Sequence, residues 1–282
     1  MRIRNPNTRR KDSGSAATAA MLALIIVVMV VTTVYIFVSR PVWSVPPPPI
    51  TSVGVDIDHQ YDLTLYVTGT VFILSQLGLA YAIFRFRDRG QKAHFTRGNN
   101  TMEVLWTTAT IILFLGLGIL GHKAWAAVRF TEASPEAIKV EVTTNQFVYN
   151  FRYPGADGKF GRLDPKQISA STGNALGIDA NDPAGKDDIV VPTLTVPVNR
   201  EVELLIRSQD VIHNFFVREL RLQQDAVPGL EVPLHFTANT IGDYEIVCTQ
   251  LCGLGHYRMR SVLHVVSDSD YLKFLKEQAP VQ

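Results

Sequence analysis

The stretch Tyr244-Glu-Ile-Val-Cys-Thr-Gln-Leu-Cys-Gly-Leu-Gly-His-Tyr-Arg-Met-Arg-Ser-Val-Leu-His-Val-Val266 decides the fold of the C-terminal half of the chain. Its ends, Tyr244–Val247 and Ser261–Val266, are rich in β-branched and aromatic residues at period two, which predicts two strands joined by a loop. Similar runs recur upstream at Lys139–Thr144, Gln146–Tyr153, Thr193–Val198, Glu201–Ser208, Asn214–Val217 and Pro233–Ala238. Many short strands with turn signals between them predict an all-β sandwich or barrel over residues 130–267.

Two segments of this half differ in composition from the predicted strands. Residues 155–188 are rich in Gly, Asp, Asn, Pro and Ser, so they are too polar for a core strand and longer than a usual connection. We expect them to form a surface insertion between strands. In the C-terminal segment 268–282, Asp268-Ser-Asp270 is expected to cap a short amphipathic helix that ends in a tail.

The N-terminal half contains three apolar segments, at residues 16–38, 63–84 and 104–121. Each is long enough, or nearly so, to cross the hydrocarbon core of a bilayer, so three transmembrane helices are predicted. The first could instead be a cleaved signal peptide. Its apolar run is longer than the core of a signal peptide, and the segment around Val38-Ser39-Arg40-Pro41 lacks a small-residue cleavage site, which favours a retained anchor.

Basic residues predict how these helices are oriented. They gather in residues 1–15 and 85–103, so both segments are expected to be cytoplasmic by the positive-inside rule. The loop 39–62, with the proline run Pro46–Pro49, and the C-terminal half then lie on the periplasmic side. The charges are divided accordingly: residues 1–128 have a net charge of +6 and residues 129–282 a net charge of −5.

The loop between the last two strands has the composition of a metal site. Cys248, Cys252, His256 and Met259 offer two thiolates, an imidazole and a thioether, a soft donor set that suits copper rather than magnesium or calcium. A blue-copper site needs only one cysteine, so the second thiolate suggests two metal ions. A further ligand is then required, and the candidate is His213 in Asp210-Val-Ile-His213.

Two other interpretations of the cysteines remain open at this point. On the oxidising side of a membrane they could form a disulfide, and a Cys₂His₂ set usually binds structural zinc. A disulfide has no use for either histidine, and a zinc site has no use for the methionine.

The loop resembles the copper A loop of cytochrome c oxidase subunit II, whose pattern is Cys-x3-Cys-x3-His-x2-Met. Asp210-Val-Ile-His213, Asp225-Ala-Val-Pro-Gly229 and a two-span hairpin before the β domain strengthen the resemblance. It implies a cupredoxin-like domain with two copper ions bridged by Cys248 and Cys252. It further implies that His213 and His256 bind one copper each, that Met259 completes one end, and that the backbone carbonyl of Gln250 completes the other.

The resemblance also implies a function. Such a subunit takes electrons from a cytochrome c, or a cytochrome c domain, and passes them to haem in subunit I, where oxygen is reduced and protons are pumped. The implied partners are subunit I, subunit III and the lipid bilayer, with haem only in the partner and no nucleic acid. The implied location is the bacterial inner (cytoplasmic) membrane.

Three positions refine this expectation. Glu103 resembles the acidic residue at the cytoplasmic entrance of the oxidase proton pathway, although a carboxylate there also stabilises a helix N-terminus. Gln250 stands where the family usually has Glu, whose side chain binds a magnesium ion shared with subunit I; a neutral amide weakens that expectation. Phe147 stands where the family has a tryptophan that accepts electrons, so either electrons enter through Phe147 or Tyr149 or the donor docks differently. Alternating aromatic residues on a strand also commonly form one packed face.

A membrane-tethered copper chaperone of the Sco type is the alternative of a different class. Such a protein has a thioredoxin-like α/β fold with its histidine after the cysteines, whereas here the distant histidine precedes them. A quinol oxidase subunit would lack the copper ligands, and the chain has no room for the catalytic domain of nitrous oxide reductase.

Overall fold

The structure is a computed structural model of the chain, and it describes residues 16–39, 45–87, 89, 95, 97–169 and 171–280. The chain divides into two compact units. One comprises Met1–Val45 and Tyr61–Gly118, and the other comprises Pro46–Gln60 and Ile119–Gln282. The second unit therefore includes the β domain together with the beginning of one long helix and the end of another.

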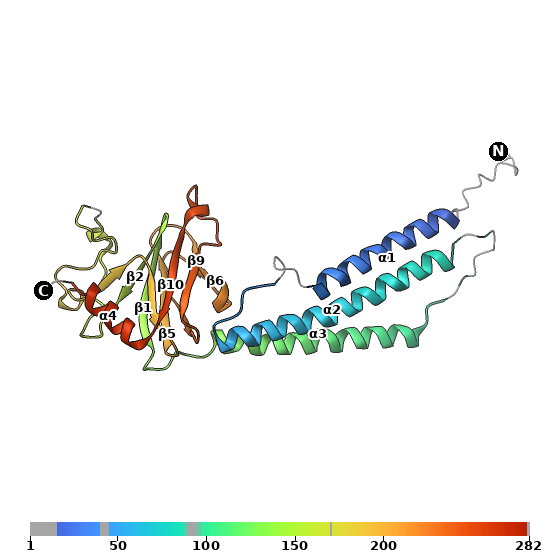
Figure 1. Cartoon of the computed structure of the whole chain (residues 1–282), viewed down its shortest axis with the longest axis horizontal. Helices are drawn as coiled ribbons and strands as arrows, with labels where there is room; N and C mark the ends of the chain where they lie inside the picture. Colours follow the sequence, from blue (N-terminus) through green and yellow to red (C-terminus); the bar gives the residue numbers. More distant parts are fainter. Residues whose placement is uncertain are drawn as a thin grey trace. The chain divides into compact units, whose positions relative to one another are not determined.

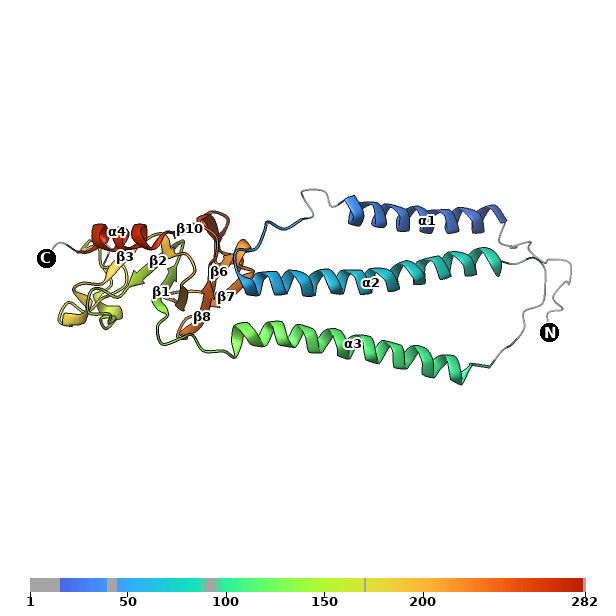
Figure 2. The same cartoon turned by 60° about the horizontal axis from the view of Figure 1, so that its bottom comes forward.

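Three helices are long and apolar enough to cross a membrane, as the sequence predicts. They are α1 (Ala16–Ser39), α2 (Ser52–Arg85) and α3 (Asn100–Arg129), and each is uninterrupted (Figure 2). The second and third extend beyond the predicted apolar segments, because hydropathy marks only the part of a helix that suits a bilayer. Part of the predicted loop 39–62 is therefore helical, and Thr51 Oγ1 caps α2 by accepting the N–H of Gly54 at 2.9 Å.

The expected loop between α2 and α3 is also shorter than residues 85–103, because α3 begins at Asn100. Asn99 Oδ1 caps this helix by accepting the N–H of Met102 at 3.2 Å. The basic N-terminal segment 1–15 lies outside the described residues, as do residues 40–44 and much of the loop after α2.

The β domain is a sandwich of two five-stranded sheets, which confirms the predicted architecture (Figure 1). The strand orders are β3-β2-β1-β5-β8 and β4-β10-β9-β6-β7. The strands are β1 (Ile138–Asn145), β2 (Val148–Tyr153), β3 (Ile189–Val191), β4 (Leu194–Pro197), β5 (Glu201–Ser208), β6 (His213–Val217), β7 (Leu222–Ala226), β8 (Val232–Thr237), β9 (Gly242–Val247) and β10 (Arg260–Val266). All eight predicted strands are present. The sequence patterns miss β3, which is three residues long, and β7, which is mostly polar.

Alternating side chains from the two sheets fill the core between them. Val142 and Leu204 of the first sheet and Phe215 and Leu263 of the second are fully buried. The period-two pattern that predicts the strands is therefore the pattern of the core. β9 and β10 pair in an antiparallel fashion with Val247 opposite Arg260, so the loop between them emerges at one end of the second sheet.

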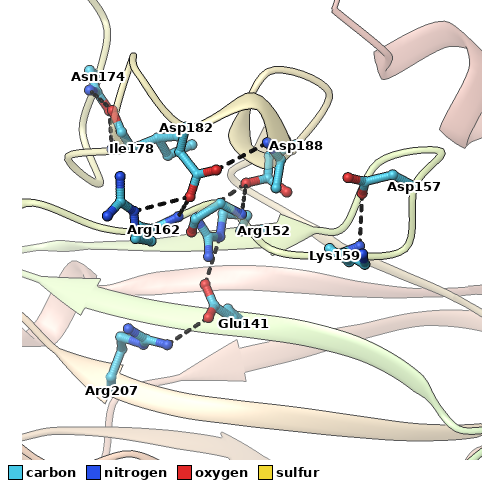
Figure 3. A network of polar contacts seen from close by, with 12 residues as sticks. Glu141, Arg152, Asp157, Lys159, Arg162, Asn174, Ile178, Asp182, Asp188 and Arg207 are labelled. Atoms are coloured by element: carbon cyan, nitrogen blue, oxygen red, sulfur yellow. Dashed lines mark hydrogen bonds and ion pairs between the residues drawn. The ribbon is translucent and has the colours of Figure 1, made fainter.

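The insertion between β2 and β3 is fastened to the outer face of the first sheet by buried charges (Figure 3). Arg152 is 1% exposed, and its guanidinium pairs with Glu141 at 2.6 Å and with Asp188 at 3.2 Å. Arg207 also pairs with Glu141 at 2.6 Å. Gly161 of the insertion accepts a hydrogen bond from Arg152 Nη1 at 2.9 Å. Burial raises the pKa of Asp188 to about 6, against the opposing effect of Arg152.

About half of the described residues of the insertion are exposed, and its loops project from the sandwich (Figure 2). Two short 3₁₀ turns, η2 (Pro165–Gln167) and η3 (Pro183–Gly185), lie within it, and two others, η4 (Arg218–Leu220) and η5 (His256–Arg258), lie elsewhere in the domain. The C-terminal helix α4 (Asp268–Gln278) is also present. Its N-cap is Ser267, whose hydroxyl accepts the N–H of Asp270, and not the predicted Asp268-Ser-Asp270, which lies in the first turn.

Candidate metal centre

Two segments of the second sheet bring the candidate ligands together. His213 is the first residue of β6, and the two cysteines lie on the loop between β9 and β10. One imidazole nitrogen of His213 and the sulfur atoms of Cys248 and Cys252 all lie within 4.8 Å of one another, and all three residues are buried. The structure therefore brings His213, from a distant segment, next to the two cysteines.

The other predicted ligands lie around the same sulfur atoms. Cys252 Sγ lies 3.6 Å from His256 Nδ1 and 3.9 Å from Met259 Sδ. On the other side, Cys248 Sγ lies 3.1 Å from the carbonyl oxygen of Gln250. All six predicted positions thus form one cluster. Glu103 is not part of it, because it lies in the first turn of α3 in the other unit.

The backbone of the loop closes on itself. The N–H of Cys248 donates to the carbonyl of Met259 at 3.2 Å, which joins the two ends of the loop next to the last pair of β9 and β10. Gly253 has a φ of +134°, a conformation that residues with a side chain rarely adopt. The loop is therefore a fixed turn that directs its sulfur and nitrogen atoms inward.

His213 is held with one ring nitrogen free. Its Nε2 lies 2.7 Å from Asp210 Oδ1, whereas its Nδ1 is buried and has no hydrogen-bond partner among the described residues. Burial alone would raise the pKa of Asp210, but hydrogen bonds from His213, Val211 and Gln146 outweigh it and lower that pKa. A metal-binding histidine characteristically donates its other N–H to a carboxylate, so the free Nδ1 is suited to bind a metal.

The donor set fits copper better than the two open alternatives. The sulfur atoms of Cys248 and Cys252 are 3.9 Å apart, whereas a disulfide bond is about 2.05 Å long. Met259 is 2% exposed and directs a thioether toward Cys252, a donor that copper accepts and structural zinc sites lack. Burial, and then the neighbouring Cys248, raise the pKa of the Cys252 thiol to about 11, so a bound cation is needed to hold it as a thiolate.

The two predicted aromatic positions border the cluster. The Phe147 ring lies against the ligand loop, where a Cβ added at Gly255 would collide with it. Tyr149 is buried, and its hydroxyl donates to the carbonyl of Asn214 at 2.6 Å. Burial, and then the negative charge of Cys248 and Cys252, raise the pKa of Tyr149. Both residues thus lie close to the cluster, with Phe147 nearer the solvent.

Sequence reasoning gave no role to the polar residues that support the ligands. For Asp210 the sequence does offer a signal, because it begins the motif Asp210-Val-Ile-His213. Asn214 and Thr249 each adjoin a ligand, and Thr249 Oγ1 donates to Asn214 Oδ1 at 2.7 Å. Adjacency to a ligand was the only signal that could have identified these two residues.

The chain is similar to known subunits of cytochrome c oxidase. The family described as "Cytochrome C oxidase subunit II, periplasmic domain" matches residues 185–266. An "Alternative cytochrome c oxidase subunit 2" of Bradyrhizobium diazoefficiens is 33% identical over 225 residues, which cover 79% of this chain and 80% of that protein. A "Cytochrome c oxidase subunit 2" of Cereibacter sphaeroides is 28% identical over 242 residues, which cover 82% of this chain and 78% of that protein.

Among solved structures, the chain is similar to the periplasmic domain of subunit II of cytochrome oxidase of Bradyrhizobium japonicum. The identity is 24%, the match covers 52% of this chain and 95% of that one, and the TM-score is 0.38.

Proposed function

Because the chain belongs to the cytochrome c oxidase subunit II family, whose members are subunits of an oxidoreductase, we propose that it carries a binuclear copper A centre and relays electrons from a cytochrome c to haem in subunit I. The observation that carries this proposal is the buried cluster of two thiols, a thioether and His213 Nδ1. Copper bound there would accept and release one electron at a time.

In this proposal the thiolates of Cys248 and Cys252, the imidazoles of His213 and His256, the thioether of Met259 and the backbone carbonyl of Gln250 would together hold the copper, which would supply one-electron transfer. Asp210 fixes the imidazole of His213 through the bond at 2.7 Å, so that Nδ1 stays directed at the cluster. Because the two cysteines, Met259 and His213 are buried in a packed interior, little rearrangement would accompany a change of charge.

We assign the route by which electrons arrive to Phe147 or Tyr149. Contact between the Phe147 ring and the backbone of Gly253 and Gly255 supports Phe147, which lies between solvent and the ligand loop. Tyr149 is a buried residue of β2. It can serve as the entry point only if electrons pass through the buried core of the domain.

The remaining assignments concern the membrane and the partner subunits. The distribution of basic residues supports a C-terminal domain on the periplasmic side of a bacterial inner membrane. The proposed partners are subunits I and III. Glu103 is assigned to the cytoplasmic entrance of the proton pathway, which serves oxygen reduction and proton pumping in the complex. Replacing Glu103 with Gln should slow turnover and leave copper content intact, whereas loss of assembly would support a purely structural role. No magnesium ion is assigned, because Gln250 offers an amide in place of a carboxylate.

The copper-chaperone alternative is not supported by the fold. A two-sheet sandwich differs from the thioredoxin-like α/β fold of such proteins, and the ligand set includes a methionine three residues after His256.

Rapid mixing of the copper-loaded full-length chain with reduced cytochrome c tests the relay. We expect oxidation of one cytochrome c per pair of coppers, and a slower reaction in the Phe147→Leu variant at unchanged copper content. A copper-loaded chain that exchanges no electron with cytochrome c, but gives up its copper to another protein, would favour the chaperone.

A further inference from the structure

In the turn Cys248-Thr249-Gln250, Thr249 and Gln250 are exposed, but hydrogen bonds that the ligand assignment does not use link the turn to the completely buried residue Asn214. Thr249 Oγ1 donates to Asn214 Oδ1 at 2.7 Å and accepts from Gln223 Nε2 at 3.1 Å. Both roles of the hydroxyl are therefore filled, which fixes its orientation. Thr249 lies between the cysteine and the residue whose carbonyl faces Cys248 Sγ.

Asn214 is the centre of this chain. It directly follows His213 on β6, and it is completely buried. Its side-chain N–H donates to Asp225 Oδ1 at 2.6 Å, and its backbone carbonyl accepts the hydroxyl of Tyr149 at 2.6 Å. Because its Oδ1 also accepts the hydroxyl of Thr249, Asn214 is fixed by three hydrogen bonds.

The arrangement joins two ligand-bearing segments through one side chain. Asn214 and Asp225 are opposite each other in the pairing of β6 with β7, so the position of Asn214 is set by the sheet. Through Thr249, the sheet in turn sets the backbone of the turn that holds Cys248. Asn214 is completely buried, so its Oδ1 is costly to leave without the hydroxyl of Thr249 as a partner.

We infer that Asn214, acting through Thr249, is a positioning residue that keeps the carbonyl oxygen of Gln250 directed at the metal site and thereby tunes its redox equilibrium. The inference rests on the proposed copper centre. A carbonyl oxygen is a hard, weak ligand that favours the oxidised metal over the softer reduced metal. If the link to Asn214 is lost, the carbonyl moves away and the equilibrium shifts toward the reduced form.

The Thr249→Val variant removes the hydroxyl and keeps the branched shape of the side chain, and it lies on an exposed turn where failure to fold is not expected. The full-length chain is loaded with copper, and its equilibrium with a reference redox dye and its electron paramagnetic resonance spectrum are measured. We expect the equilibrium to move about three- to tenfold toward the reduced form, the range that one hydrogen bond supports. Copper per chain should stay at the wild-type value, and the copper hyperfine splitting should change.

Two further variants sharpen the test. Asn214→Ala should move the redox equilibrium in the same direction. The double variant Asn214→Ala/Thr249→Val should shift it only slightly more than the stronger single variant, because both changes remove the same link. Thr240→Val is the matched control. It removes a hydroxyl bonded to Asn239 Oδ1 at 2.8 Å, away from the ligand loop, and should leave the equilibrium and the spectrum unchanged.

A Thr249→Val chain with the wild-type redox equilibrium and spectrum would overturn the inference. So would a variant that only lowers the melting temperature of the copper-free protein, because that result means a structural role alone. A wild-type chain that binds no copper would instead defeat the proposed function, so the two failures are distinguishable.

Discussion

Removing the carboxylate of Asp210 should weaken copper binding about 10- to 100-fold. Asp210 Oδ1 lies 2.7 Å from Nε2 of His213, and Oδ2 accepts the N–H of Gln146 at 2.8 Å. His213 is completely buried and the Asp210 side chain is 32% exposed, so a water that entered in place of the carboxylate would carry no charge and would not fix the ring through a second bond to Gln146. A hydrogen bond to a charged group contributes about 1.5–3 kcal/mol, and loss of such a partner typically costs about 10- to 100-fold in metal affinity.

The assay is competition for copper between the full-length chain and a chelator of known affinity. Asp210→Ala should show the full loss. Asp210→Asn should show an intermediate loss, because its amide keeps one acceptor oxygen and presents a donor in place of the other.

Asp243→Ala provides the matched control. Asp243 Oδ1 also lies 2.7 Å from an imidazole nitrogen, that of His264, but this pair is exposed and lies at the far end of the β9–β10 hairpin from the ligand loop. This variant should retain copper as the wild type does. Equal copper retention by Asp210→Ala and Asp243→Ala would refute the claim that Asp210 orients a ligand.

Other predictions concern the support of the site. Arg152→Met leaves Glu141 and Asp188 buried without their shared partner, which should cost about 3–5 kcal/mol of stability and lower the melting temperature by about 6–20 °C in a thermal unfolding scan. Lys139→Ala breaks only an exposed ion pair with Glu203 at 3.8 Å, so it should lower the melting temperature far less. Equal effects of the two variants would contradict this. The pKa of Asp188 is raised to about 6 in the folded state, so the folded chain binds more protons than the unfolded chain between about pH 4 and pH 6, and the stability from this residue falls as the pH rises through that window. The melting temperature of the wild type relative to Asp188→Asn should therefore decrease from pH 4 to pH 6 and be constant above it; a rising difference would show the opposite sign. Gly255→Ala places a methyl group in the Phe147 ring, so copper per chain should fall, and adding Phe147→Leu should restore it.

The parts of this fold that the sequence predicts are those with a local pattern. Period-two alternation predicts β5 at its observed limits, because every second side chain of that strand, Val202, Leu204 and Ile206, is buried in the core. β7 has the sequence Leu222-Gln-Gln-Asp-Ala226, with no such pattern, and it exists because β6 pairs with it along its length.

In the candidate site too, local patterns predict some residues, whereas others depend on contacts between distant segments. The spacing within the loop predicts the ligands Cys248 through Met259, because they are close in sequence. The Asn214–Thr249 bond joins residues 35 positions apart, and the fastening of the insertion by Arg152 and Asp188 likewise depends on the sheet that brings them together. Tertiary pairings of this kind carry no local signal.

The most direct test of the central claim is a metal analysis of the full-length chain, combined with electron paramagnetic resonance. The proposed centre predicts two coppers per chain that share one unpaired electron, with loss of that signal in the Cys252→Ser variant. Zinc, or a single copper with a blue-type spectrum, would contradict it.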